Sequence, residues 1–150
     1  MKFEKVVESH YYDRFGELLY ILHKNNRKYL NDALAEYDLN LLQAMCMFIM
    51  IDRKDINQQE LADLLFLTKS GTTKAIRKLE VDGFIERSKS EKDARQYVLN
   101  LTQKGYDTIP TLIRIYEEWE ELIGLNELDK EFFEILTKLT YKAIDLNKKE

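Results

Sequence analysis

Residues 68–87 of this 150-residue chain read TKSGTTKAIRKLEVDGFIER, and this stretch decides the fold. Thr68 is a good N-cap, and positions three and four apart share one face of the helix that it begins. The packing face of that helix holds Thr72, Ala75, Ile76 and Leu79. The polar, basic face holds Ser70, Thr73, Lys74 and Arg77. Gly83 is well placed to end the helix, so an extended segment is expected from Phe84.

The residues that follow predict a β-hairpin. Phe84–Arg87 forms its first strand, and Gln96–Leu101 alternates between apolar and polar residues as a second strand would. The side chains expected on the inner side of the second strand are Tyr97, Leu99 and Leu101. The connection, Ser88–Arg95, is long and charged. Residues 68–95 hold eight Lys or Arg against five Asp or Glu, although the whole chain has a net charge of -4, so positive charge is concentrated here.

Three helices are predicted before this segment. The first runs from about Ser9 to Glu36, and its apolar stripe is Tyr11, Phe15, Leu18, Leu22, Tyr29 and Ala33. The second, Leu39 to about Ile51 with Asp38 as its cap, is apolar nearly all round and is expected to form the core. In the third, Asn57 and Glu60 have the spacing of a capping box. Its inward residues are Leu61, Ala62 and Leu65.

Two long helices are predicted after the hairpin. Thr102 caps the first of them, and Pro110 is expected to bend it. Its apolar stripe is Ile109, Leu112, Ile113, Tyr116, Trp119 and Ile123. The last helix begins at about Asp129, with the stripe Phe132, Leu136, Leu139, Ala143 and Leu146. The long helices at the two chain ends carry more apolar surface than a small core can cover, which favours pairing with a second copy.

This order of elements predicts a mainly α fold with a small β-hairpin wing, a winged helix-turn-helix. We expect one domain over residues 1–150, with a winged lobe at 38–101 and dimerisation helices at 9–36 and 103–147. A single α-helix fits the major groove of double-stranded DNA, where hydroxyl, Lys and Arg groups reach phosphates and base edges. Double-stranded DNA is therefore the expected partner.

The candidate DNA-contact residues lie on the two short helices and on the hairpin. Lys69 and the free N–H groups at helix starts are expected to meet phosphates, with a contribution from Gln59. The full set is Gln58, Lys69, Ser70, Thr72, Thr73, Lys74, Arg77, Lys89, Lys92, Asp93 and Arg95. A basic helix face is also typical of an ordinary solvated surface, and the charged hairpin beside it is what favours DNA contact.

Five motifs carry a resemblance to a known family. They are INQQELA (56–62), KSGTTKAIRKLE (69–80), DGFIER (82–87), DAR (93–95) and LTQKG (101–105). In this order and spacing the chain resembles the MarR family of bacterial and archaeal transcription regulators. The resemblance implies a homodimeric repressor that binds a pseudo-palindrome. It further implies that Arg95 enters the minor groove with its guanidinium held by Asp93, that Lys89 and Lys92 contact phosphates, and that small aromatic acids or phenols bind as effectors.

Other functions find less support in the residues. Cys46 would be a sensor thiol only if it were ionised, but it lies in the most apolar helix, where burial makes a thiol inert. His10 and His23, thirteen residues apart on one helix, point to nearly opposite faces, so no metal site and no cofactor are expected. The first helix is rich in tyrosines, which indicates packing, with an effector pocket as the alternative.

No enzyme is expected, because the sequence offers no nucleophile and base pair and no phosphate-binding glycine loop. The longest apolar run, Ala44–Ile51, is eight residues, far short of the roughly 18 to 20 that cross a bilayer, and the N-terminus does not resemble a secretory signal. We therefore expect a cytoplasmic protein. A winged-helix module that binds other proteins without sequence-specific DNA binding remains the alternative function.

Overall fold

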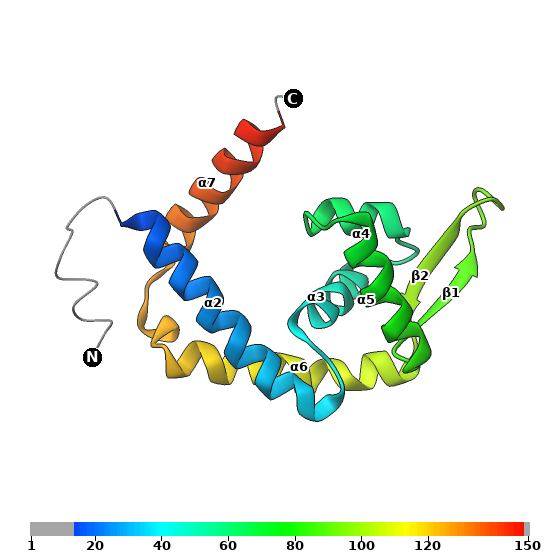
Figure 1. Cartoon of the computed structure of the whole chain (residues 1–150), viewed down its shortest axis with the longest axis horizontal. Helices are drawn as coiled ribbons and strands as arrows, with labels where there is room; N and C mark the ends of the chain where they lie inside the picture. Colours follow the sequence, from blue (N-terminus) through cyan, green and yellow to red (C-terminus); the bar gives the residue numbers. More distant parts are fainter. Residues whose placement is uncertain (1–13, 149–150) are drawn as a thin grey trace. The chain divides into compact units, whose positions relative to one another are not determined.

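The structure, a computed structural model, describes residues 14–148 and is built mainly of helices (Figure 1). The predicted start of the first helix, with Tyr11 and His10, lies outside the described residues. In chain order the elements are α2 (Phe15–Leu34), η1 (Ala35–Tyr37), α3 (Leu41–Asp52), α4 (Gln58–Leu64), α5 (Lys69–Val81), β1 (Ile85–Lys89), β2 (Tyr97–Leu101), α6 (Gln103–Leu122), η2 (Leu125–Glu127) and α7 (Lys130–Asn147). The chain divides into two compact units between Ile115 and Tyr116. No single helix in the described part of the chain is long and apolar enough to cross a membrane.

Helix α3 begins later than the sequence predicts. Its N-cap is Asn40, which forms a capping box with Gln43: the Gln43 N–H donates to Asn40 Oδ1 and the Asn40 N–H donates to Gln43 Oε1, both at 2.9 Å. Asp38, the predicted cap, has a left-handed backbone (φ 58°) and ends η1 instead. The prediction was wrong because Asn40 satisfies two backbone donors reciprocally. Helix α3 is the core helix as expected, with Ala44, Cys46, Met47 and Met50 buried.

The caps predicted for α4 and α5 are confirmed. Asn57 and Glu60 form a capping box, and Thr68 Oγ1 accepts a hydrogen bond from the Gly71 N–H. The predicted packing face of α5 is buried. Helix α5 ends before Gly83, whose φ of 81° is in the left-handed region that favours glycine.

The two strands form an antiparallel hairpin that extends from the helices (Figure 1). Ile85 pairs with Leu101 at its base and Lys89 with Tyr97 toward its tip. The predicted alternation on β2 is only partly confirmed, since Val98 is buried as well as Leu99, and Tyr97 is 50% exposed. Tyr97 is exposed because it lies at the tip end of the pairing, beyond the base of the hairpin.

The end of α5, the base of the hairpin and the start of α6 meet at one junction. The Thr102 hydroxyl donates to the Gly83 carbonyl at 2.6 Å and accepts from the Gly105 N–H at 3.1 Å, which confirms Thr102 as a cap. The Thr102 N–H donates to the Phe84 carbonyl, and Lys104 Nζ donates to the Asp82 carbonyl at 2.6 Å. Two of the sequence motifs, DGFIER and LTQKG, therefore hold each other through backbone groups.

Gly105 permits this close approach. A Cβ atom at position 105 would lie 2.2 Å from the Phe84 carbonyl oxygen, closer than real Cβ contacts allow. The glycine of LTQKG is thus required by packing, because α6 rests directly on the backbone that leaves α5.

The long helices bury less than their stripes suggest. On α2 the buried residues are Leu30 and Leu34, and the predicted stripe residues Phe15, Leu18 and Leu22 are exposed. Helix α6 continues through Pro110 and buries Ile109, Leu112 and Ile115. Ile113 of the predicted stripe is 42% exposed, whereas Ile115, which the stripe leaves out, is buried.

Helix α7 begins where expected. Asp129 accepts a hydrogen bond from the Phe132 N–H at 3.2 Å and so caps the helix. The described side chains of α7 include no buried residue, and all residues of its predicted apolar stripe are exposed. This helix therefore presents an uncovered apolar face in the single chain.

Replacing Gly105 by Ala should destabilise the fold by about 1–3 kcal/mol, because the added methyl group forces apart two backbone segments. Gly16→Ala is the matched control, since nothing lies within 4 Å of a Cβ at Gly16, and it should stabilise α2 by roughly 0.5–1 kcal/mol. Thermal unfolding followed by circular dichroism at equal protein concentration measures both. Equal unfolding temperatures for the two variants would contradict the packing argument.

Candidate nucleic-acid interface

The polar face of α5 is open to solvent. Ser70, Thr73, Lys74 and Arg77 are all exposed, as the sequence predicts. They line a shallow hollow of about 660 Å³, together with Lys78, Val81 and Asp82. The helix presents hydroxyl, ammonium and guanidinium groups to this hollow, which is the chemistry that meets phosphates and base edges.

Three cations of α5 have no acidic partner in the described part of the chain. Lys69, Lys74 and Arg77 are exposed, and no ion pair within residues 14–148 engages them. Lys78, at the edge of the hollow, differs: its ammonium pairs with Asp82 at 2.5 Å, and this hydrogen bond raises the Lys78 pKa above its ordinary value. The three other charges are therefore available to an anionic partner.

Thr72 does not belong to this face. Its side chain is fully buried, and its hydroxyl donates to the Thr68 carbonyl at 2.8 Å. The prediction that Thr72 contacts DNA is corrected on this ground, because the packing role assigned to the same residue excludes a contact by its side chain.

Gln58, from α4, reaches the exposed face of α5. Its Nε2 donates to Thr73 Oγ1 at 2.7 Å, and Thr73 Oγ1 donates in turn to the Lys69 carbonyl at 2.9 Å. Gln59 instead donates to Asp63 on its own helix. The structure thus brings Gln58, but not Gln59, together with the candidate residues of α5.

The hairpin tip is an ordered turn with exposed basic side chains. Ser90 Oγ accepts from the backbone N–H groups of Lys92 and Asp93, and the Asp93 carboxylate accepts from the Arg95 N–H at 3.0 Å. The implied pairing of Asp93 with the Arg95 guanidinium is not present among the described residues, because the carboxylate holds the Arg95 backbone instead. Lys89, Lys92 and Arg95 are exposed.

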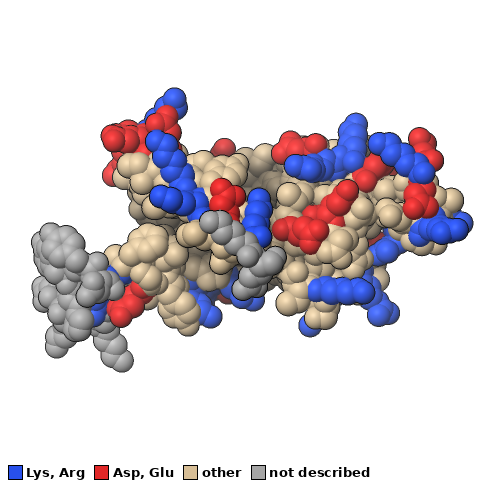
Figure 2. Space-filling model, turned by 90° about the horizontal axis from the view of Figure 1, so that it is seen from above, with Lys and Arg blue, Asp and Glu red and all other residues tan. Residues whose placement is uncertain are grey.

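The surface charge is mixed rather than uniformly basic. Figure 2 shows Lys and Arg side chains interspersed with Asp and Glu at the end that carries the hairpin. Basic groups are therefore present at particular positions on this surface rather than as one continuous basic patch.

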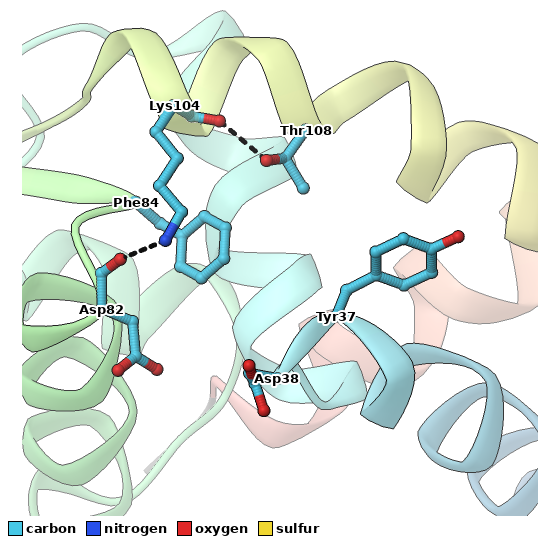
Figure 3. Close-up of a pocket in the computed structure, with 6 residues that line it drawn as sticks. All are labelled: Tyr37, Asp38, Asp82, Phe84, Lys104 and Thr108. Carbon is cyan, nitrogen blue, oxygen red and sulfur yellow. Dashed lines mark hydrogen bonds between the residues drawn. The ribbon is translucent and has the colours of Figure 1, made fainter.

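A separate hollow lies at the junction described above (Figure 3). Its volume is about 520 Å³, and it is lined by Tyr37, Asp38, Asp82, Phe84, Lys104 and Thr108. The Lys104 ammonium stands 4.3 Å from the centre of the Phe84 ring. These side chains come from segments far apart in the chain, so the sequence alone predicts no pocket residue.

Cys46 is fully buried in α3, and burial raises the pKa of its thiol to about 12. The thiolate, which is the reactive form, is therefore suppressed at neutral pH. This environment is the one that the sequence predicts for an inert, structural cysteine.

The arrangement of α3, α4, α5 and the hairpin defines the class of protein, a winged helix-turn-helix protein. Residues 39–97 match the model of the MarR family. This match, together with the relatives and solved structures described below, supports the resemblance to MarR family transcription regulators seen in the motifs.

The relatives are named as regulators. YdcH of Bacillus subtilis (strain 168), an uncharacterized HTH-type transcriptional regulator, is 29% identical over 122 residues, which cover 79% of this chain and 83% of YdcH. The HTH-type transcriptional regulator BilQ of Clostridioides difficile (strain CD3) is 24% identical over 128 residues, which cover 85% of this chain and 86% of BilQ.

Solved structures show the same fold. A MarR transcriptional regulator from Methanosarcina mazei Go1 superposes with a TM-score of 0.76 at 28% identity, covering 89% of this chain and 96% of that one. S. aureus MepR, in a structure of a MepR–DNA complex, superposes with a TM-score of 0.74 at 19% identity over 87% of this chain and 96% of that chain, and shows the fold alone.

Proposed function

We propose that this protein is a homodimeric, sequence-specific transcription regulator that binds double-stranded DNA in the cytoplasm and acts as a repressor. The observation that carries the proposal is the exposed face of α5, whose cations Lys69, Lys74 and Arg77 are without acidic partners among the described residues, beside a hairpin tip with an exposed arginine. The DNA complex solved for MepR, which has the same fold, supports it.

In the proposed complex α5 lies in the major groove and the hairpin follows the backbone into the adjacent minor groove. The α5 contacts come from Ser70, Thr73, Lys74 and Arg77, with Lys69 on a phosphate and Gln58 beside them. The hairpin contributes Lys89, Lys92 and Arg95, and Asp93 holds the backbone of the turn that presents Arg95. A narrow minor groove concentrates negative potential, which favours an arginine there.

Uncovered apolar faces support the homodimer. Phe15, Leu18 and Leu22 of α2 are 65%, 45% and 54% exposed, and Leu136 and Leu139 of α7 are 43% and 48% exposed. Apolar faces of this extent on a monomer mark contact surfaces. We assign residues 15–36 and 103–147 to dimerisation and residues 38–101 to the winged lobe, with each protomer reading one half-site of a pseudo-palindrome.

We further propose that a small aromatic or phenolic ligand modulates DNA affinity from the hollow at Tyr37 and Phe84. Three of its lining residues, Asp82, Phe84 and Lys104, hold the end of α5 and the base of the hairpin together. A ligand that displaces these residues changes the spacing between α5 and the hairpin, and it thereby lowers or raises the affinity for DNA.

Selection from a random duplex pool tests the proposed function. Purified protein should enrich a pseudo-palindrome whose half-sites are about one helical turn apart, bound by two protomers, because two related recognition helices meet the same face of the duplex. Enriched sequences are read, and binding is repeated at two salt concentrations. Weak binding without enrichment, lost at moderate salt, would refute the proposal and favour the protein-binding module instead.

Arg95→Ala should weaken binding to the selected duplex by at least about 1 kcal/mol, the low end for a specific groove contact. Lys69→Ala should weaken binding to all DNA sequences alike. It should also make the slope of log affinity against log salt concentration shallower by about one, as expected for one lost phosphate contact. Lys138→Ala on α7 is the control and should leave both the affinity for the selected duplex and its salt dependence unchanged. A fluorescence titration measures these affinities. The assignments would be contradicted if Lys69→Ala weakened binding to some sequences only, or if Arg95→Ala left the affinity unchanged.

Leu136→Glu should shift the protein from dimer to monomer, because it buries a charge in the proposed interface. Lys138→Glu is the matched control on the same helix, two positions away on its polar face. Sedimentation velocity at several concentrations distinguishes the species. If the Leu136→Glu variant stays dimeric at every concentration, this face of α7 is not the dimer interface.

A further inference from the structure

The direction of the hydrogen bonds at Thr73 is fixed by chemistry. A carbonyl oxygen only accepts, so Thr73 Oγ1 must donate its single proton to the Lys69 carbonyl, 2.9 Å away. Gln58 Nε2 lies 2.7 Å from the same oxygen and must therefore be the donor of that bond. The Thr73 hydroxyl thus has no proton left to offer to a partner.

The other branch of the Thr73 side chain is a methyl group. The hydroxyl is turned back against its own helix and Gln58, and the residue as a whole is exposed between Ser70 and Arg77 on the polar face of α5. The methyl group is the branch that remains for the outward side. A residue that looks polar in sequence therefore offers an apolar contact.

We propose that Thr73 contacts DNA through its γ-methyl group and selects thymine at one base pair of each half-site, with Gln58 as the positioning residue that holds its hydroxyl inward. The inference rests on the proposed function. Of the four bases, only thymine presents a methyl group in the major groove, and contact between two methyl groups removes apolar surface from water. A hydroxyl without a free proton cannot donate to guanine N7 or to a phosphate.

Replacement of thymidine by deoxyuridine tests this directly, because it removes only the C5 methyl group. Each thymidine of the selected duplex is replaced in turn, in both half-sites, and the affinity of the wild-type protein is measured. One position should lose affinity by about fourfold per half-site, the effect of one buried methyl group.

Two variants at position 73 identify the group responsible. Thr73→Val keeps a methyl group and lacks the hydroxyl, so it should retain the thymine over uracil preference at that position. Thr73→Ser keeps the hydroxyl and lacks the methyl group, so it should bind both duplexes equally. Position 73 is exposed, so both variants should unfold at the wild-type temperature.

Several outcomes would overturn the inference while the proposed function stands. In the first, the wild-type protein binds the selected duplex, but no thymidine-to-deoxyuridine replacement lowers its affinity. In the second, Thr73→Ser keeps the full preference for thymine over uracil. In the third, Thr73→Val loses that preference. If selection enriches no sequence at all, the proposed function and this inference fail together, and that result appears before any uracil duplex is made.

Discussion

The contact between the Phe84 carbonyl and Gly105 is the constraint on which the winged lobe depends. A side chain at position 105 would meet that carbonyl at 2.2 Å, and Thr102 bridges Gly83 and Gly105 through one hydroxyl. The chain leaves α5 and enters the hairpin at the same place where it leaves the hairpin and enters α6. The base of the hairpin is therefore held to the end of α5 and the start of α6 by bonds to backbone groups. The proposed contacts of these two elements with neighbouring DNA grooves would need such a fixed spacing.

The same junction would provide a physical basis for the proposed ligand response. The Lys104 ammonium donates to the Asp82 carbonyl and stands over the Phe84 ring, and all three residues line the hollow of about 520 Å³ (Figure 3). A ligand in contact with these groups competes with the bonds that position the hairpin base. Because a ligand shifts an equilibrium only by its differential affinity for two states, the relevant difference is whether Lys104 keeps its bond to Asp82.

Local patterns in the sequence predicted the features that depend on local chemistry. The caps at Asn57, Thr68 and Thr102 are confirmed because each cap bonds within three residues of itself. Predictions that depend on residues distant in the sequence were less accurate. Asp38 is not the cap of α3, because Asn40 forms the reciprocal capping box with Gln43. The predicted stripe of α6 includes the exposed Ile113 and lacks the buried Ile115, because a stripe alone does not say which side the rest of the fold covers. Among the candidate contact residues, Thr72 is buried and Asp93 accepts from a backbone N–H rather than from a guanidinium. The other residues of the set stay predictions.

The bond between Gln58 and Thr73 shows why residue type is an incomplete guide to a recognition surface. The two residues are fifteen positions apart, and nothing in their spacing joins them. Once joined, the direction of the bond follows from the Lys69 carbonyl, which can only accept, and this in turn decides which branch of Thr73 is free. A hydroxyl that is exposed and a hydroxyl that is available to a base are different things. What a recognition helix reads therefore depends on the bonds its side chains already make within the protein.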